Sequence, residues 1–164
     1  MDLEQCWARF VKAEELLEQG HWPEAQYLYN DVLEHLPIYV TQAAESDDIK
    51  PCQMSCLLAG LKDAAISQSE ILNKMGQQRE AFDLLNQTYA HMQFLALEQY
   101  DIVRAVEPTL IQHSETIFRH IAAFCAAQRN ASWQLELDAL QKAHHHFNQL
   151  KLYSERTSAV YTLN

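Results

Sequence analysis

The chain has 164 residues, a mass of 19.0 kDa and a formal net charge of −10. This length suits one domain with its own hydrophobic core, and the negative charge argues against a protein that binds nucleic acid by neutralising phosphates. With three Gly, four Pro and 48% hydrophobic residues, and without strand-like runs of Val, Ile and Thr, the composition favours an all-helical protein.

Membrane and secretion signals are not expected from the sequence. No apolar run approaches the roughly 18 residues that a membrane-spanning helix needs. The first residues, MDLEQC, carry acid where a signal peptide carries base. Four scattered cysteines then predict reduced, buried or half-buried thiols at Cys6, Cys52, Cys56 and Cys125. We therefore expect a soluble, cytoplasmic protein.

The negative charge is concentrated in the first third of the chain. Residues 1–50 carry eleven acidic and three basic side chains, whereas residues 51–164 carry eleven acidic and nine basic ones. An acidic N-terminal part would attract a basic partner. The simpler alternative is a solvated face that keeps the chain in solution.

Two predicted helices begin the chain. The first spans residues 2–19, with Asp2 as its N-cap, and Gly20 ends it because Gly accepts the left-handed backbone conformation. Pro23 suits the first turn of the second helix, where its missing N–H would have had no partner. Pro37 is expected to end this helix.

The middle of the chain predicts a loop and two longer helices. Residues 38–51 contain Ser, Asp and a Lys-Pro step, which indicate a loop. A helix follows over residues 52–75, and Gly76 repeats the stop signal of the first hairpin. The next helix is expected to run from Gln78 to about Val106.

The remaining sequence predicts a third helical hairpin. One helix begins at Glu107-Pro108 and continues to about Ala127, and another runs from Trp133, with Ser132 as its N-cap, to about Leu152. The tail, residues 153–164, either docks as a short helix or stays loose, and a tail that folds back would fill any groove. About six main helices in one domain, 1–152, are therefore expected, in antiparallel hairpins at about 2–37, 52–106 and 107–152.

Residues around the first turn resemble the core of a tetratricopeptide (TPR) repeat. The family's turn glycine, turn aromatic, small residue, large aromatic and final proline correspond to Gly20, Trp22, Ala25, Tyr29 and Pro37. A second, partial match has Gly76, Ala81 and Leu85, with Gln78 in place of the turn aromatic. The two glycines lie 56 residues apart, whereas the family period is about 34 residues. The resemblance implies a short, irregular, right-handed TPR-like array, and the alternative is an ordinary helical hairpin.

Chemistry-bearing residues do not form a recognisable catalytic or metal-binding motif. Cys52 and Cys56 would share a helix face, but a metal site needs two further ligands. His113 and His120 would share another face, while His144 and its two histidine neighbours point in different directions. No nucleophile motif, phosphate-binding loop or di-iron pattern occurs. We therefore expect neither an enzyme nor a bound cofactor.

The TPR resemblance implies which residues would face the groove of the array. They lie on the first helix of each of the first two hairpins: Trp7, Phe10, Glu14, Leu17 and Glu18, then Asp63, Ile66, Glu70, Asn73 and Lys74. TPR domains that hold chaperone carboxylates use a clamp of Lys, Arg and Asn, whereas these positions are mainly acidic and apolar. They favour a basic or amphipathic segment of a partner protein.

The sequence thus predicts a non-catalytic protein–protein interaction module, an adaptor or chaperone-like protein that binds neither nucleic acid nor membrane. Two alternatives come from other classes. One is a structural homo-oligomer that packs through Trp7 and Trp133. The other is a small-ligand or metal sensor that uses Cys52, Cys56 and the histidines.

Overall fold

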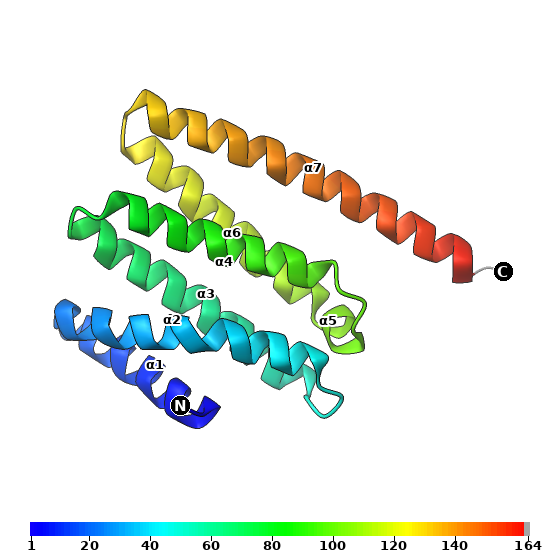
Figure 1. The fold of residues 1–164 in the computed structure, drawn as a ribbon, viewed down its shortest axis with the longest axis horizontal. Coiled ribbons are helices and arrows are strands. Elements are labelled where there is room, and N and C mark those ends of the chain that lie inside the picture. The colour runs from blue at the N-terminus through cyan, green and yellow to red at the C-terminus, as the bar shows by residue number, and fades with distance from the viewer. Residues whose placement is uncertain (163–164) are drawn as a thin grey trace. The chain divides into compact units, whose positions relative to one another are not determined.

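The computed structural model describes residues 1–162, and this part of the chain is helical with short connections and no strand. The all-helical prediction is therefore confirmed. None of the helices within these residues is long and apolar enough to cross a membrane. Seven α-helices occur in residues 1–162 (Figure 1): α1 (Leu3–Glu18), α2 (Trp22–Glu45), α3 (Pro51–Lys74), α4 (Gln78–Ala96), α5 (Asp101–Ala105), α6 (Glu107–Ala127) and α7 (Ala131–Thr162).

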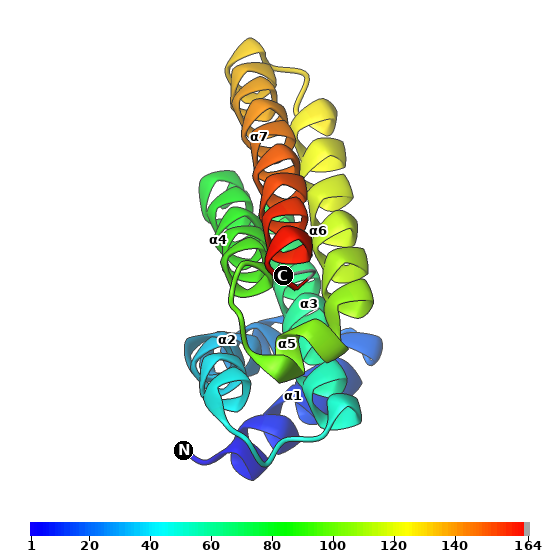
Figure 2. The same ribbon diagram turned by 90° about the vertical axis from the view of Figure 1, so that its right-hand side faces the viewer.

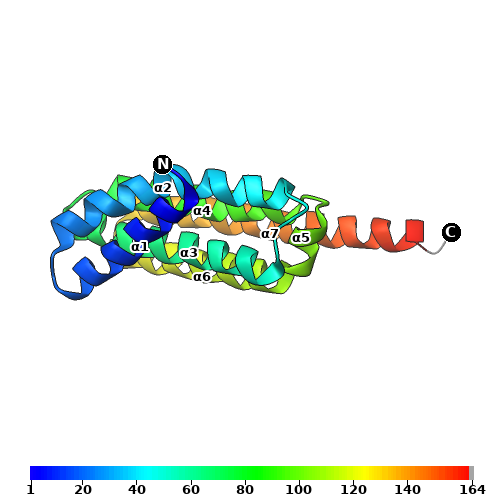
Figure 3. The ribbon, with the colours of Figure 1, turned by 90° about the horizontal axis from the view of Figure 1, so that it is seen from below.

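The chain divides into two compact units, Met1–His120 and the residues from Ile121 onward, where a single domain over residues 1–152 was predicted. In the first unit, α2 packs against both α1 and α3, and α3 also packs against α4. Helices α1 and α3 lie on one side of this unit and α2 and α4 on the other, as Figures 2 and 3 both show. Helices α1 and α2 run antiparallel, as do α3 and α4, so each pair forms one of the two expected hairpins (Figure 1).

The predicted helix signals at the first two hairpins are confirmed. The Gln5 amide donates to Asp2 Oδ1 at 2.8 Å, and the Asp2 amide donates to Gln5 Oε1 at 3.2 Å, which is a capping box. Gly20 and Gly76 adopt φ of +80° and +79° at the ends of α1 and α3. Pro23 lies in the first turn of α2. Local backbone chemistry therefore sets these starts and stops.

Helix α2 does not end at Pro37, and this prediction was wrong. The helix continues to Glu45, with Pro37 in its interior. An interior proline costs about 3 kcal/mol, because its helical hydrogen bond is lost and its ring crowds the preceding turn. Leu36, Val40 and Ala44 recur at four-residue spacing and are all buried, so the core-facing stripe continues across the proline. The predicted loop over 38–51 shrinks to residues 46–50.

The helix predicted from Gln78 to about Val106 is also interrupted. Helix α4 ends at Ala96, and the short α5 follows after an extended backbone at Tyr100, so the structure has one helix more than predicted. The interruption redirects the chain so that Ile102, Val103 and Val106 become buried. Helix α5 contacts both α3 and α4, so packing rather than a local breaker decides this turn.

In the second unit, the end of α6 and the start of α7 pack through an aromatic pair. The rings of Phe124 and Trp133 meet edge to face with centroids 5.2 Å apart. The predicted N-cap at Ser132 was wrong by two positions, because Asn130 Oδ1 accepts from the Ser132 amide at 2.9 Å and α7 begins at Ala131. Helix α7 continues through the predicted tail to Thr162, and residues 163–164 lie outside the described residues.

Replacing Gly20 by Ala is expected to lower the free energy of unfolding by about 1–2 kcal/mol, because a side chain disfavours the left-handed backbone. Apart from Gly20 and its chain neighbours, no atom lies within 4 Å of the Cβ position, so contacts with the rest of the fold add nothing to this cost. Urea denaturation followed by far-ultraviolet circular dichroism measures the change. Gly20→Asn is the control and is expected to cost less, since Asn tolerates this conformation. An Ala variant as stable as the wild type would contradict the prediction.

Candidate functional site

An open apolar groove lies in the first unit, where α1 begins, α2 ends and α3 begins. Its cavity volume is about 1110 Å³, and its apolar wall includes Leu3, Trp7, Tyr39, Ile49 and Leu57. These helix ends lie at the same end of the antiparallel hairpins (Figure 1). The groove is therefore built from elements that meet only in the folded chain.

Unequal helix lengths explain why this groove is open. Helix α1 has 16 residues, whereas α2 and α3 have 24 residues each. The Tyr39 hydroxyl donates to the Met1 carbonyl, so the chain begins beside Tyr39. The turns of α2 beyond Tyr39 and the first turns of α3 consequently extend past the start of α1. Gln42, Ala43 and Cys52 line the part of the groove that α1 leaves uncovered.

The indole ring of Trp7 reaches α3 at a buried glycine. A Cβ atom at Gly60 would lie 2.8 Å from Trp7 Cζ3 and 3.2 Å from Cη2, so this close approach requires glycine. The Trp7 ring also contacts that of Phe10, with centroids 5.2 Å apart. Trp7 nevertheless keeps 36% of its surface exposed. It is thus an aromatic side chain held against the scaffold and accessible from the groove.

Two of the four free thiols line this groove. Cys52 and Cys56 are exposed on α3, which corrects the expectation that all four thiols are buried or half-buried. Cys6 and Cys125 are buried, and burial raises the pKa of both thiols. No group of three or more His, Cys, Asp or Glu side chains in residues 1–162 is arranged to hold a metal ion.

The charged side chains at the groove are acidic. Glu4 and Asp48 belong to its lining, and no Lys, Arg or His among the described residues does. Arg9 of α1 instead forms an ion pair with Asp31 of α2. The groove therefore combines an apolar wall with negative charge at its edges, which favours an amphipathic, positively charged ligand.

The structure distributes the five predicted groove residues of α1 over different environments. Trp7 lines the groove, whereas Phe10 is buried in contact with the Trp7 ring and does not line it. Glu14 is half-buried and accepts a hydrogen bond from the Tyr29 hydroxyl, so it contributes to the contact between α1 and α2. Burial is the largest cause of the raised pKa of Tyr29, and this bond to Glu14 adds to it. Leu17 is half-buried and Glu18 is exposed at the far end of α1.

The predicted groove residues of α3 lie away from this groove. Ile66 is half-buried, and Asp63 forms an ion pair with Lys62 at 3.1 Å. The other three, Glu70, Asn73 and Lys74, are exposed near the end of α3. None of the five, all of which the structure describes, lines the groove. A partner contact at these positions stays a prediction.

Sequence reasoning missed most of the groove because Tyr39 and Ile49 fell in the predicted loop. The available signal was the four-residue spacing of Leu36, Val40 and Ala44 across Pro37, which continues the apolar stripe. Gly60 carried no visible signal, because its role depends on the approach of a distant ring.

Comparison of the chain with models of known protein families, with characterised proteins and with solved structures finds no match. The groove and its chemistry are therefore the features from which a function can be inferred.

Cys52 and Cys56 are expected to react with iodoacetamide well before Cys6 and Cys125. The first two are exposed, whereas burial both shields the other two and reduces their thiolate fraction at neutral pH by raising the pKa. Mass spectrometry of the alkylated chain over time measures the four rates. The urea-denatured chain is the control, in which all four rates should converge. Equal rates in the folded chain would contradict the described burial.

Gly60→Ala is expected to displace the Trp7 ring, because the new methyl group would lie 2.8 Å from it. In the Trp7→Leu background the same change should instead stabilise α3 by roughly 0.5–1 kcal/mol, since Ala is the better helix former. Urea denaturation of the four variants forms a double-mutant cycle. A coupling energy of zero between the two positions would show that the contact between Trp7 and Gly60 has no effect on the free energy of unfolding.

Proposed function

We propose that the chain is a non-catalytic protein-binding module, an adaptor or chaperone-like array of TPR-like hairpins, that holds a basic or amphipathic segment in the apolar groove. The observation that carries this proposal is the groove itself, with about 1110 Å³ of space beside a partly exposed Trp7. An exposed apolar hollow that contains an aromatic side chain is typical of a helix-docking surface.

The packing of the first two hairpins supports the TPR-like part of the proposal. Ala25 and Ala81 occupy equivalent positions after the turn glycines, and both are fully buried. Tyr29 and Leu85 follow at the same spacing and are buried too. Small residues at these positions allow close helix approach, which is the physical basis of the family pattern.

The surface chemistry supports a partner that is positively charged. The groove lining contains Glu4 and Asp48, and residues 1–50 carry a strong excess of acid. Free thiols exposed at Cys52 and Cys56 suit a reducing compartment, which supports a cytoplasmic location. We therefore propose that the module is cytoplasmic and selects Lys- or Arg-containing segments.

Two synthetic helical peptides with the same Leu stripe test this function, one with Lys and one with Glu on the polar face. We expect the Lys peptide to bind at least about tenfold more tightly at low salt, with the difference falling as salt rises. Fluorescence anisotropy measures affinity. Alkylation of Cys52 and Cys56 shows whether the groove is covered, since both thiols line it.

A pair of variants matched in charge provides the control. Ala8→Arg introduces a long cationic side chain into the groove lining, whereas Gln87→Arg adds the same charge at an exposed position of α4. Only Ala8→Arg should abolish binding and thiol protection. Light scattering shows whether a second copy occupies the groove instead. Binding that leaves both thiols reactive, or equal binding of the Lys and Glu peptides, would refute the proposal.

A further inference from the structure

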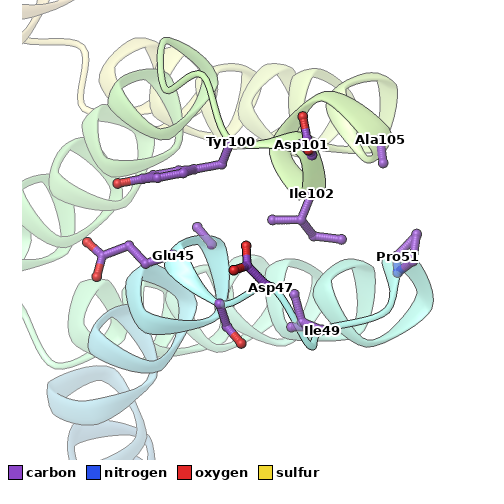
Figure 4. A pocket seen from close by; sticks show the side chains of 10 residues that line it. Glu45, Asp47, Ile49, Pro51, Tyr100, Asp101, Ile102 and Ala105 are labelled. Atoms are coloured by element: carbon purple, nitrogen blue, oxygen red, sulfur yellow. The ribbon is translucent and has the colours of Figure 1, made fainter.

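A second, smaller hollow of about 300 Å³ lies between the α2–α3 connection and α5. Figure 4 shows Asp47 and Ile49 on the side of the connection and Ile102 on the side of α5, with the hollow between them. At one end, the Tyr100 ring extends alongside Glu45. We call this hollow the acidic pocket.

The acidic pocket and the apolar groove share part of their lining. Ser46 and Ile49 belong to both, so the two hollows lie on either side of the same short connection. A ligand that extends along the groove beyond the start of α1 therefore lies beside the connection that also lines the acidic pocket. The smaller volume admits a side chain, whereas the larger groove has room for a helix.

The chemistry of the acidic pocket matches a planar cation. Glu45, Asp47 and Asp101 supply carboxylates to the lining, and no lining residue among those described is basic. No salt bridge involves these three carboxylates within residues 1–162. Tyr100 is 38% exposed, which leaves ring surface for a cation. An aromatic face beside carboxylates favours a guanidinium, which stacks on the ring and donates to the oxygens.

We infer that the segment held in the apolar groove places an arginine side chain in the acidic pocket, against Tyr100 and the carboxylates of Glu45 and Asp47. This inference rests on the proposed function and adds the residue that fixes the segment's position along the groove. The apolar stripe of the segment supplies contact area, and the arginine supplies register and selectivity.

The test uses the helical Leu/Lys peptide with one terminal residue changed between arginine and its neutral isostere citrulline. Each form is made with this residue at the amino end or the carboxyl end, so that both orientations are covered. The affinity of each peptide is measured for the wild type, Asp47→Asn and Tyr100→Leu. Glu34→Gln removes one charge from an exposed position of α2 outside both hollows and is the matched control.

In one peptide orientation, Asp47→Asn and Tyr100→Leu are each expected to weaken binding of the arginine peptide about three- to tenfold. The affinity of the citrulline peptide should change by less than about twofold, because citrulline carries no charge that the pocket could bind. Glu34→Gln should affect the arginine and citrulline peptides alike. Circular dichroism confirms that each variant is folded.

Three results would overturn the inference, and they are distinguishable from one another. If Asp47→Asn weakens the arginine and citrulline peptides equally, the carboxylate acts only through long-range attraction. If the peptides protect Cys52 and Cys56 but neither pocket variant changes affinity, the groove binds the segment without the pocket. If no peptide protects the thiols of the wild type, the proposed function and this inference both fail.

Discussion

The packing of α2 beyond Pro37 is the constraint on which the groove depends. Val40 and Ala44 are buried, and full burial of a side chain such as Val40 contributes about 1.5–3 kcal/mol, comparable with the cost of an interior proline. The Thr41 hydroxyl also donates to the Pro37 carbonyl at 3.1 Å. Because α2 continues, its last turns extend past the shorter α1. Tertiary burial thus creates an exposed hollow at the same place where it overrides a local stop signal.

Two features give the apolar groove a defined shape and a negative charge. Gly60 lets the Trp7 ring approach the α3 backbone, which positions an aromatic surface without burying it. In the connection after α2, Asp47 lines the acidic pocket, whereas Asp48 lines the apolar groove. An apolar wall supplies binding energy, while the carboxylates select partners by charge. The same short connection therefore contributes both to the shape of the apolar groove and to its selectivity for positively charged partners.

Local signals predicted the elements that depend on backbone chemistry. The cap at Asp2, the left-handed turns at Gly20 and Gly76 and the start of α6 at Glu107 follow from preferences that act within a few residues. Elements that depend on contacts were not predictable in this way. The break before α5 has no Gly or Pro, and burial of Ile102 and Val103 determines it. Likewise, Trp7 was the one predicted groove residue among the ten described that lines the groove.

The sequence by itself determined an all-helical chain, the two hairpins in which a glycine ends the first helix, and the excess of acid in residues 1–50. Composition and short-range backbone preferences suffice for these properties. The tertiary structure decided where α2 ends, how Trp7 meets Gly60 and that Cys52 and Cys56 are exposed. These properties depend on side chains that are distant in sequence and approach one another only after folding. A groove between helices belongs to this second class, since its walls come from three separate helix ends.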